Sequence, residues 1–152
     1  MTLTLDIDQS AFEKSVLDCF ASVKVPCQAA MANTFATVVH HNFGDDGEDR
    51  PSEWQPLRKG YAERYHGGDR TPKLILSGDL QRSIEIDEAG EEAATVSTSN
   101  PYAILMQEGG QNEEGFNIPA RPFFPIVGGE ATPYTAQKCL DACGAQLERS
   151  LR

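Results

Sequence analysis

Residues 84–98, IEIDEAGEEAATVST, are the stretch of sequence that decides the fold. Apolar or small residues alternate with polar ones on both sides of a turn-forming centre, EAGEE; they are Ile84 and Ile86, then Ala94, Val96 and Thr98. This alternation is typical of strands with one buried face. We therefore predict an antiparallel hairpin with strands at about 84–88 and 93–99. A third extended segment, 118–127, is expected to complete a small sheet.

Upstream of the hairpin, apolar residues recur at helical spacing. The first group is Phe12, Val16, Phe20 and Val23, and the second is Met31, Phe35 and Val38 with Val39 adjacent. Pro26 lies between the groups, and a proline inside a helix removes one hydrogen bond and clashes with the preceding turn. We expect either two helices or one helix kinked at Pro26, ending near residues 42–44, where Gly44 suits a left-handed cap.

Downstream of the hairpin, the chain closes with a helix. Thr132 is placed to cap it and Pro133 to occupy its first turn. Apolar residues follow in one stripe, namely Ala136, Leu140, Cys143, Leu147 and Leu151. Amphipathic helices need a partner for such a stripe. The predicted fold class is α+β, a small antiparallel β-sheet packed against N-terminal and C-terminal α-helices in a single domain over 1–152.

The charge of the chain restricts its partners. It has 152 residues and a formal net charge of −10, which makes it poor material for binding nucleic acid. A local basic group, Arg58, Lys59, Arg64, Arg70 and Lys73, is interpreted as solvated charge in a polar loop. No apolar run approaches the roughly 18 residues of a membrane span, and the N-terminus lacks the pattern of a secretory signal.

The polar stretch 43–73 is rich in Gly and Pro and is expected to be mostly loop. It contains Trp54, the single tryptophan, for which a place as a lid on the core is favoured because tryptophan is highly buried on average. Tyr61 and Tyr65 are four residues apart and fit a short helix. A loop of this length in a small domain is otherwise functional or disordered.

The sequence offers little catalytic chemistry. The sequence contains no phosphate-binding loop, no GxSxG nucleophile elbow and no HExxH zinc-binding helix. A small hydrolase that uses His41 with the Asp45 and Asp46 cluster is the alternative, and a solvated acidic loop is the preferred interpretation. The four cysteines, Cys19, Cys27, Cys139 and Cys143, have no zinc-finger spacing to a histidine and are expected to be free thiols that are buried as small apolar side chains. We predict no catalytic site, no metal and no cofactor.

An ordered series of short motifs resembles the phage virion morphogenesis family, the tail-completion proteins of Mu-like and P2-like phages. The matching residues are Trp54, Pro56, Leu57, Leu74, Leu76, Ser77, Gly78, Leu80, Ser83, Ile84, Tyr102, Ala103, Gln107, Gly109, Ile118, Pro119, Ala120, Arg121, Pro122 and Phe123. The run Ile-Pro-Ala-Arg-Pro-Phe is unusual and carries most of the specificity. Two features depart from the family pattern: Met106 stands where a histidine is usual, and the loop 110–117 is acidic.

The resemblance implies a structural role at the end of a phage tail or in the neck, as a tail terminator or head–tail joining protein without a cofactor. It implies a homo-oligomeric ring, hexameric by analogy, that contacts the tail tube protein and the head–tail connector proteins in the virion. It implies no membrane contact and no specific nucleic-acid binding, although genomic DNA passes through such a ring. The net charge of −10 leaves an acidic anti-host inhibitor as another alternative.

The stiff segment 116–127 is expected to contribute to ring contacts, because a stiff segment loses less entropy on docking. Arg121 could pair with a carboxylate of a neighbouring subunit, or equally hold the segment in place within the chain. Phe123 and Phe124 are adjacent, so in an extended segment one is expected in the core and the other at the interface. The predicted interface residues are Trp54, Tyr102, Gln107, Pro119, Arg121, Phe123 and Phe124.

Overall fold

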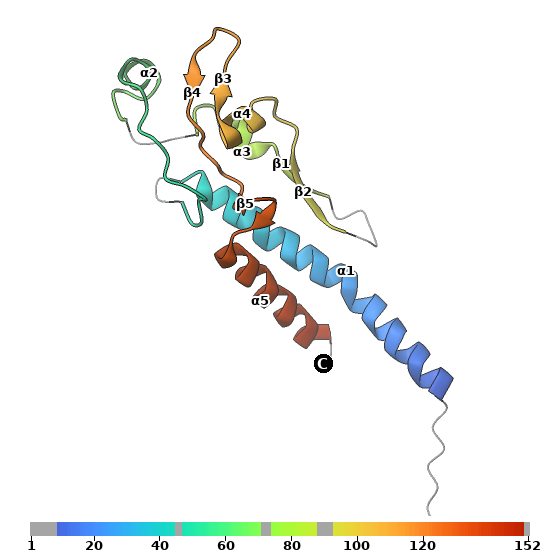
Figure 1. The fold of residues 1–152 in the computed structure, drawn as a ribbon. Helices are drawn as coiled ribbons and strands as arrows, with labels where there is room; N and C mark the ends of the chain where they lie inside the picture. Colours follow the sequence, from blue (N-terminus) through green and yellow to red (C-terminus); the bar gives the residue numbers. More distant parts are fainter. Residues whose placement is uncertain (1–8, 45–46, 71–73, 88–92, 151–152) are drawn as a thin grey trace, which may run out of the picture.

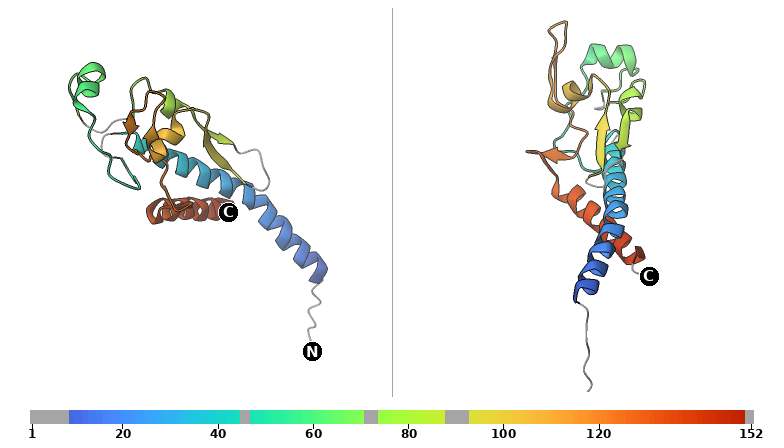
Figure 2. Two further views of the ribbon diagram at one scale, coloured as in Figure 1. Left: turned by 45° about the horizontal axis from the view of Figure 1, so that its top comes forward. Right: turned by 90° about the vertical axis from the view of Figure 1, so that its right-hand side faces the viewer.

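The computed structural model describes residues 9–44, 47–70, 74–87 and 93–150. One long helix, α1 (Gln9–Asn42), forms the spine of an elongated molecule (Figure 1). The C-terminal helix, α5 (Pro133–Ser150), lies beside the middle and C-terminal part of α1, and the short strands and helices gather at the C-terminal end of α1 (Figures 1 and 2). The N-terminal end of α1 extends beyond everything else that is described.

Helix α1 is one element, although Pro26 lies inside it. Of the two alternatives that the sequence left open, the single helix is therefore the correct one, and its axis bends partway along its length (Figure 1). The helix ends at Asn42, as predicted, and the chain turns there through hydrogen bonds from Phe43 N to His40 O and from Gly44 N to His41 O.

Helix α5 packs antiparallel against α1 through small side chains. The Cys139 thiol donates to the Met31 carbonyl (3.5 Å), and the Cys27 thiol donates to the Cys143 carbonyl (3.7 Å). The buried residues of α5 are Thr135 and Cys139. Small side chains at the contact let the two helix axes approach closely.

The predicted stripe of α5 is only partly correct, because Ala136 and Cys143 are half-buried but its described leucines are not. Leu140 is 59% exposed and Leu147 is also exposed, whereas the buried line runs through Thr135 and Cys139. Leu151, the last member of the stripe, lies outside the described residues. Hydrophobicity alone favoured the leucines, but close packing against α1 selected the side of α5 with smaller residues.

The predicted hairpin is confirmed. Strands β1 (Ile84–Asp87) and β2 (Thr95–Thr98) pair antiparallel, with Ile84 opposite Thr98 and Ile86 opposite Val96. These residues form the half-buried face and contact α1, while Glu85 is exposed.

The predicted third strand, 118–127, does not join this sheet. Its ends belong to two separate two-stranded ladders. Strand β3 (Gly110–Gln111) pairs with β4 (Asn117–Ile118), and β5 (Ile126–Val127) pairs with β6 (Glu130–Ala131). The residues between carry three prolines, at 119, 122 and 125. Because proline has no N–H to donate to a ladder, this segment cannot serve as a regular strand.

Three short helices complete the described chain: α2 (Lys59–Tyr65), α3 (Asp79–Arg82) and α4 (Ala103–Glu108). The first confirms the helix predicted from Tyr61 and Tyr65. Gly109 ends α4 with φ of 75°, and a Cβ there would lie 2.7 Å from the Ala120 backbone nitrogen. Only glycine allows the chain after α4 to pass so close to residues 118–120.

The core lies where these elements meet the C-terminal end of α1. Its buried cluster consists of Val39, Phe43, Trp54, Ala103 and Phe123. Trp54 is 6% exposed and its indole N–H donates to the Pro122 carbonyl (3.1 Å), which confirms its predicted place as a lid. Helices at both ends and small antiparallel ladders make the fold α+β, as predicted. No helix in the described ranges combines the length and apolarity needed to cross a bilayer.

Candidate functional site

Residues 116–127, called the arm below, are held against the body of the protein by several side chains, and one amide side chain makes three of these hydrogen bonds. The Gln107 Oε1 accepts hydrogen bonds from the backbone nitrogens of Phe123 and Phe124, each at 3.0 Å, and its Nε2 donates to the Phe124 carbonyl (3.2 Å). Gln107 lies in α4. A side chain that satisfies three backbone groups replaces the ladder that the prolines prevent.

Two of the three phenylalanines of the arm, Phe123 and Phe124, turn toward the protein interior, whereas Phe116 is 54% exposed. Phe123 is 1% exposed and its ring lies 5.0 Å from that of Phe43. Phe124 is half-buried against Phe35, at 6.0 Å, and the Phe123 and Phe124 rings are 5.1 Å apart. The simple alternation expected of an extended segment does not apply, because the segment between Pro122 and Pro125 is not a strand.

The remaining predicted interface residues differ in how they meet solvent. Tyr102 is 63% exposed at the start of α4, and Pro119 is half-buried. Trp54 belongs to the core and holds the arm through Pro122. Pro119, Arg121, Phe123 and Phe124 belong to the arm, and Trp54 and Gln107 bind its backbone. Their role in subunit contacts stays a prediction.

Arg121 is a buried arm residue with an unpaired hydrogen-bond donor. It is 7% exposed, and its Nη2 donates to the Gln55 carbonyl (3.3 Å) while its Nε has no hydrogen-bond partner. Burial lowers the pKa of its guanidinium, and nearby Tyr61 opposes that shift. No ion pair joins it to a carboxylate of the described residues, and its side-chain contact within the chain is the hydrogen bond to Gln55.

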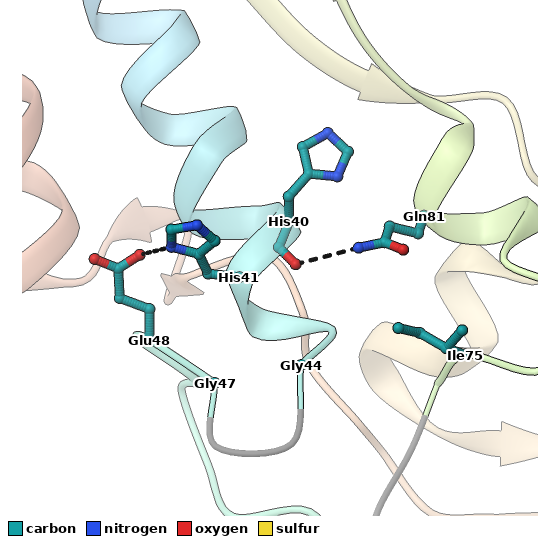
Figure 3. Close-up of a pocket in the computed structure, with 7 residues that line it drawn as sticks. All are labelled: His40, His41, Gly44, Gly47, Glu48, Ile75 and Gln81. Carbon is teal, nitrogen blue, oxygen red and sulfur yellow. Dashed lines mark hydrogen bonds and ion pairs between the residues drawn. The ribbon is translucent and has the colours of Figure 1, made fainter.

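A shallow pocket of about 480 Å³ lies beside the C-terminal end of α1. His40, His41, Glu48 and Gln81 line it together with Ile75 and two glycines (Figure 3). His41 Nδ1 lies 2.6 Å from Glu48 Oε2, while the other Glu48 oxygen accepts from the Tyr134 hydroxyl (2.9 Å) and from Lys138. Lys138, then His41 and Tyr134, hold the pKa of Glu48 at about 2, against the opposing effect of burial.

Next to this pocket, a buried polar network joins the C-terminal end of α1 to the start of α5. Asp49 Oδ2 accepts hydrogen bonds from the hydroxyls of Thr132 and Thr135, at the start of α5. Asn42, fully buried at the end of α1, accepts from Asp49 N (2.8 Å) and donates to the Asp49 carbonyl (2.9 Å). Thr132 also accepts from Thr135 N (3.4 Å), which confirms its predicted capping role.

These contacts change the interpretation of the acidic loop. The sequence suggested solvated charges, but Glu48 and Asp49 lock the ends of α1 and α5 together. Nothing in their spacing revealed the threonines that bind them, because those lie more than 80 residues away. Asp45 and Asp46, the acids proposed to work with His41, lie outside the described residues.

The thiols serve packing. All four cysteines are free, as predicted. Cys27 and Cys139 are buried, and burial raises the pKa of both, with a hydrogen bond to Cys143 adding to the effect at Cys27. Cys19 is exposed, unlike the buried thiol that was expected. Within the part of the chain that the structure describes, no three His, Cys, Asp or Glu side chains gather in a way that could hold a metal ion.

Comparison with known proteins identifies the family. The phage virion morphogenesis family matches residues 14–148. No curated protein and no solved structure matches the chain. Because the matched range covers most of the sequence, the chain belongs to the phage virion morphogenesis family, which confirms the resemblance seen in its motifs.

Proposed function

We propose that this member of the phage virion morphogenesis family is a ring-forming subunit that completes the tail, capping the tail tube and joining it to the head. The family match over residues 14–148 carries the proposal, because it establishes a role in building the virion. The ring, its place at the tail end or neck, and its hexameric stoichiometry are the parts that we add. Its partners are further copies of itself, the tail tube protein and the head–tail connector proteins.

The shape of the subunit supports ring formation. A cyclic ring is built from head-to-tail contacts, in which two different surfaces of each subunit meet. The exposed large apolar side chains include two well-separated pairs: Leu17 and Phe20 on the projecting end of α1, and Tyr102 and Ile104 at the start of α4. Ile104 is 73% exposed, which is costly for a side chain that stays in water.

The arm supports the same proposal. Gln107 and Trp54 fix its backbone before any partner arrives, so docking would cost little conformational entropy. Phe123 and Trp54 act from the core by holding the arm, whereas Tyr102 and Arg121 keep groups that a neighbour could use.

The family membership suggests a structural protein without enzymatic activity, and the pocket geometry agrees with that interpretation. A general base needs a pKa near the working pH, but the pKa of Glu48 is about 2 and Lys138, Tyr134 and His41 engage both of its oxygens. Replacing His41 and Asp46 together is therefore expected to leave virions intact. A hydrolase would lose its function.

Electron microscopy of particles made without this protein tests the proposal. Headless tails of irregular length would indicate a tail terminator, and full heads beside tails of regular length would indicate a joining protein. Normal infectious particles in the absence of the gene would overturn both roles and favour an anti-host function. Genomic DNA passing through the ring requires no specific binding, and the net charge of −10 is in keeping with that.

A further inference from the structure

Three arginines of this acidic chain donate to main-chain carbonyls instead of carboxylates. Arg70 Nε binds the Leu57 carbonyl (2.9 Å), Arg58 Nη2 the Asn117 carbonyl (3.0 Å), and Arg121 Nη2 the Gln55 carbonyl (3.3 Å). None forms an ion pair with an acid in the described ranges. With a net charge of −10, carboxylates are abundant in this protein, so the absence of pairing here is informative.

Each of these guanidinium groups is oriented by a single carbonyl, and Arg58 and Arg70 are exposed. A guanidinium has five N–H donors in a rigid fork, and one carbonyl engages a single donor. The deficit is largest at Arg121, which is 7% exposed and whose Nε bonds to nothing. A buried charge without a counter-charge is unfavourable, and an arriving carboxylate would relieve it.

An aromatic side chain flanks the same place. Tyr61, in α2, lies close enough to Arg121 for each to influence the other electrostatically, and it is 42% exposed. Its ring contacts that of Tyr65, with centroids 4.9 Å apart. We call Arg58, Arg70, Arg121 and Tyr61 the arginine site. Its composition, positive and aromatic, is typical of interface centres.

The complementary composition occurs at the end of the β3–β4 hairpin. Asn112 closes the turn: its side chain accepts from Phe116 N (2.8 Å), its carbonyl accepts from Gly115 N (2.9 Å), and its own N–H donates to Phe116 O (3.0 Å). The ordered turn presents Glu113 and Glu114, both exposed, and Phe116, which is 54% exposed. We call Glu113, Glu114 and Phe116 the acidic tip.

The acidic tip and the arginine site lie at the same end of the molecule. The hairpin projects from the body beside α2, and both stand at the end opposite the N-terminal part of α1 (Figures 1 and 2). Subunits arranged side by side around a ring would therefore carry tip and site at the same height. Contacts between two different patches of identical subunits are what a closed ring requires.

We infer that, in the ring, the acidic tip of one subunit docks on the arginine site of the next. Glu113 and Glu114 pair with Arg58, Arg70 and Arg121, and Phe116 packs beside Tyr61. The inference rests on the proposed function, since it names the partner of a ring contact. Carboxylate pairs with arginine can be bidentate, which fixes the register of neighbouring subunits. A phosphate of DNA could also bind the guanidinium groups, but DNA binding would not account for the exposed carboxylates and phenylalanine of the acidic tip.

Complementation of a phage that lacks this gene tests the contact. One variant reverses the exposed arginines of the site (Arg58→Glu with Arg70→Glu), a second reverses the tip (Glu113→Lys with Glu114→Lys), and a third combines all four changes. The first two are each expected to lower the yield of infectious particles by at least about tenfold, because like charges then meet at the contact. The combined variant is expected to recover most of that loss, since the reversed pairs attract again.

Matched controls separate this effect from net charge and from folding. Arg149→Glu, which makes half of the charge change of the arginine variant, and Glu130→Lys with Glu148→Lys, which makes all of that of the tip variant, lie at exposed positions outside the contact and should complement like wild type. Melting temperatures of the purified variants report folding. If reversal lowers one of them, the neutral pairs Arg58→Gln with Arg70→Gln and Glu113→Gln with Glu114→Gln replace it, with a smaller loss expected.

Each result of the complementation assay has a distinct interpretation. Wild-type yield from either reversed variant overturns the contact. Loss from the arginine variant alone would assign the site to another anion, such as DNA phosphate. Loss from both without recovery in the combined variant would assign it to a different virion protein, and both results overturn docking between copies. Normal particles from the gene deletion itself would instead overturn the proposed function.

Discussion

The two ends of helix α1 are alike in sequence and opposite in environment. At its C-terminal end, Val39 and Phe43 are almost fully buried under Trp54 and the arm. At its N-terminal end, Leu17 and Phe20 are each 67% exposed, because α5 and the small strands do not reach that far (Figure 1). Helical periodicity shows which residues can be covered. Whether a cover exists depends on the rest of the chain or on a partner.

The two ends of α1 also contribute to different free energies, that of folding at one end and that of assembly at the other. Burial at the C-terminal end stabilises the isolated chain, since apolar area removed from water contributes in proportion to its extent. The N-terminal end contributes little to the stability of a single subunit, and its apolar side chains are available for assembly. Substitutions at the two ends should therefore have very different effects on unfolding.

The largest effect is expected from Phe123→Ala. Phe123 is 1% exposed and packs against Phe43 and Phe124. Truncating a buried phenylalanine costs about 3–5 kcal/mol of unfolding free energy. Chemical denaturation of the purified protein measures the loss. A loss below about 1 kcal/mol would show that the arm is not part of the core in solution.

The second effect concerns the polar join between α1 and the following loop. Asn42→Ala removes an amide that accepts from Glu48 N and Asp49 N and donates to the Asp49 and Phe123 carbonyls. Leaving such buried groups unpaired costs about 1–3 kcal/mol. Asn33→Ala is the matched control, since Asn33 is an exposed asparagine of the same helix. Equal melting temperatures for the two variants would contradict the importance of the network.

A smaller effect is expected from pH. The folded pKa of Glu48, about 2, lies below its ordinary value of 4.5, so its ionised form stabilises the folded state. That contribution is complete above about pH 4.5 and is lost as pH falls from there through 2. Glu48→Gln should therefore make the melting temperature decline less between about pH 5 and about pH 3. Glu130→Gln, at an exposed strand position, should leave the decline unchanged.

The smallest effect on stability is expected at the other end of α1. Leu17→Ser with Phe20→Ser should change the unfolding free energy of the isolated chain by no more than about 0.5 kcal/mol, because exposed substitutions usually have little effect. The same variant is expected to reduce particle yield in complementation if this end is covered during assembly. A large drop in melting temperature would show that these side chains are already packed in the free protein.

Much of the local structure could be predicted because its causes are local. The β1–β2 hairpin follows from the alternation on both sides of residues 88–92, α1 ends at Asn42, and α5 starts at Pro133 after its Thr132 cap. The resemblance that identified the family also depended on short motifs in order. The hairpin, the end of α1 and the Thr132 cap each depend on residues that lie close to one another in the sequence.

The predictions that were wrong concern segments whose contacting residues lie far away in the sequence. Residues 118–127 looked like a third strand, but their prolines and the Gln107 amide made them an arm instead. The leucines of α5 looked like its buried stripe, but α1 accepted the face with Thr135 and Cys139. Hydrophobicity ranks residues by their own preference, whereas packing also depends on the shape that the facing element offers.

The sequence by itself determined the family, the α+β class, the end of α1, the start of α5 and the lid role of Trp54. Only the tertiary structure decided that Glu48 and Asp49 join α1 to α5, and that Arg58, Arg70 and Arg121 face no carboxylate of the described chain. The physical reason is the range of the interactions. Caps, turns and periodicity act between near neighbours, while the partner of a charge is fixed only when distant segments have packed together.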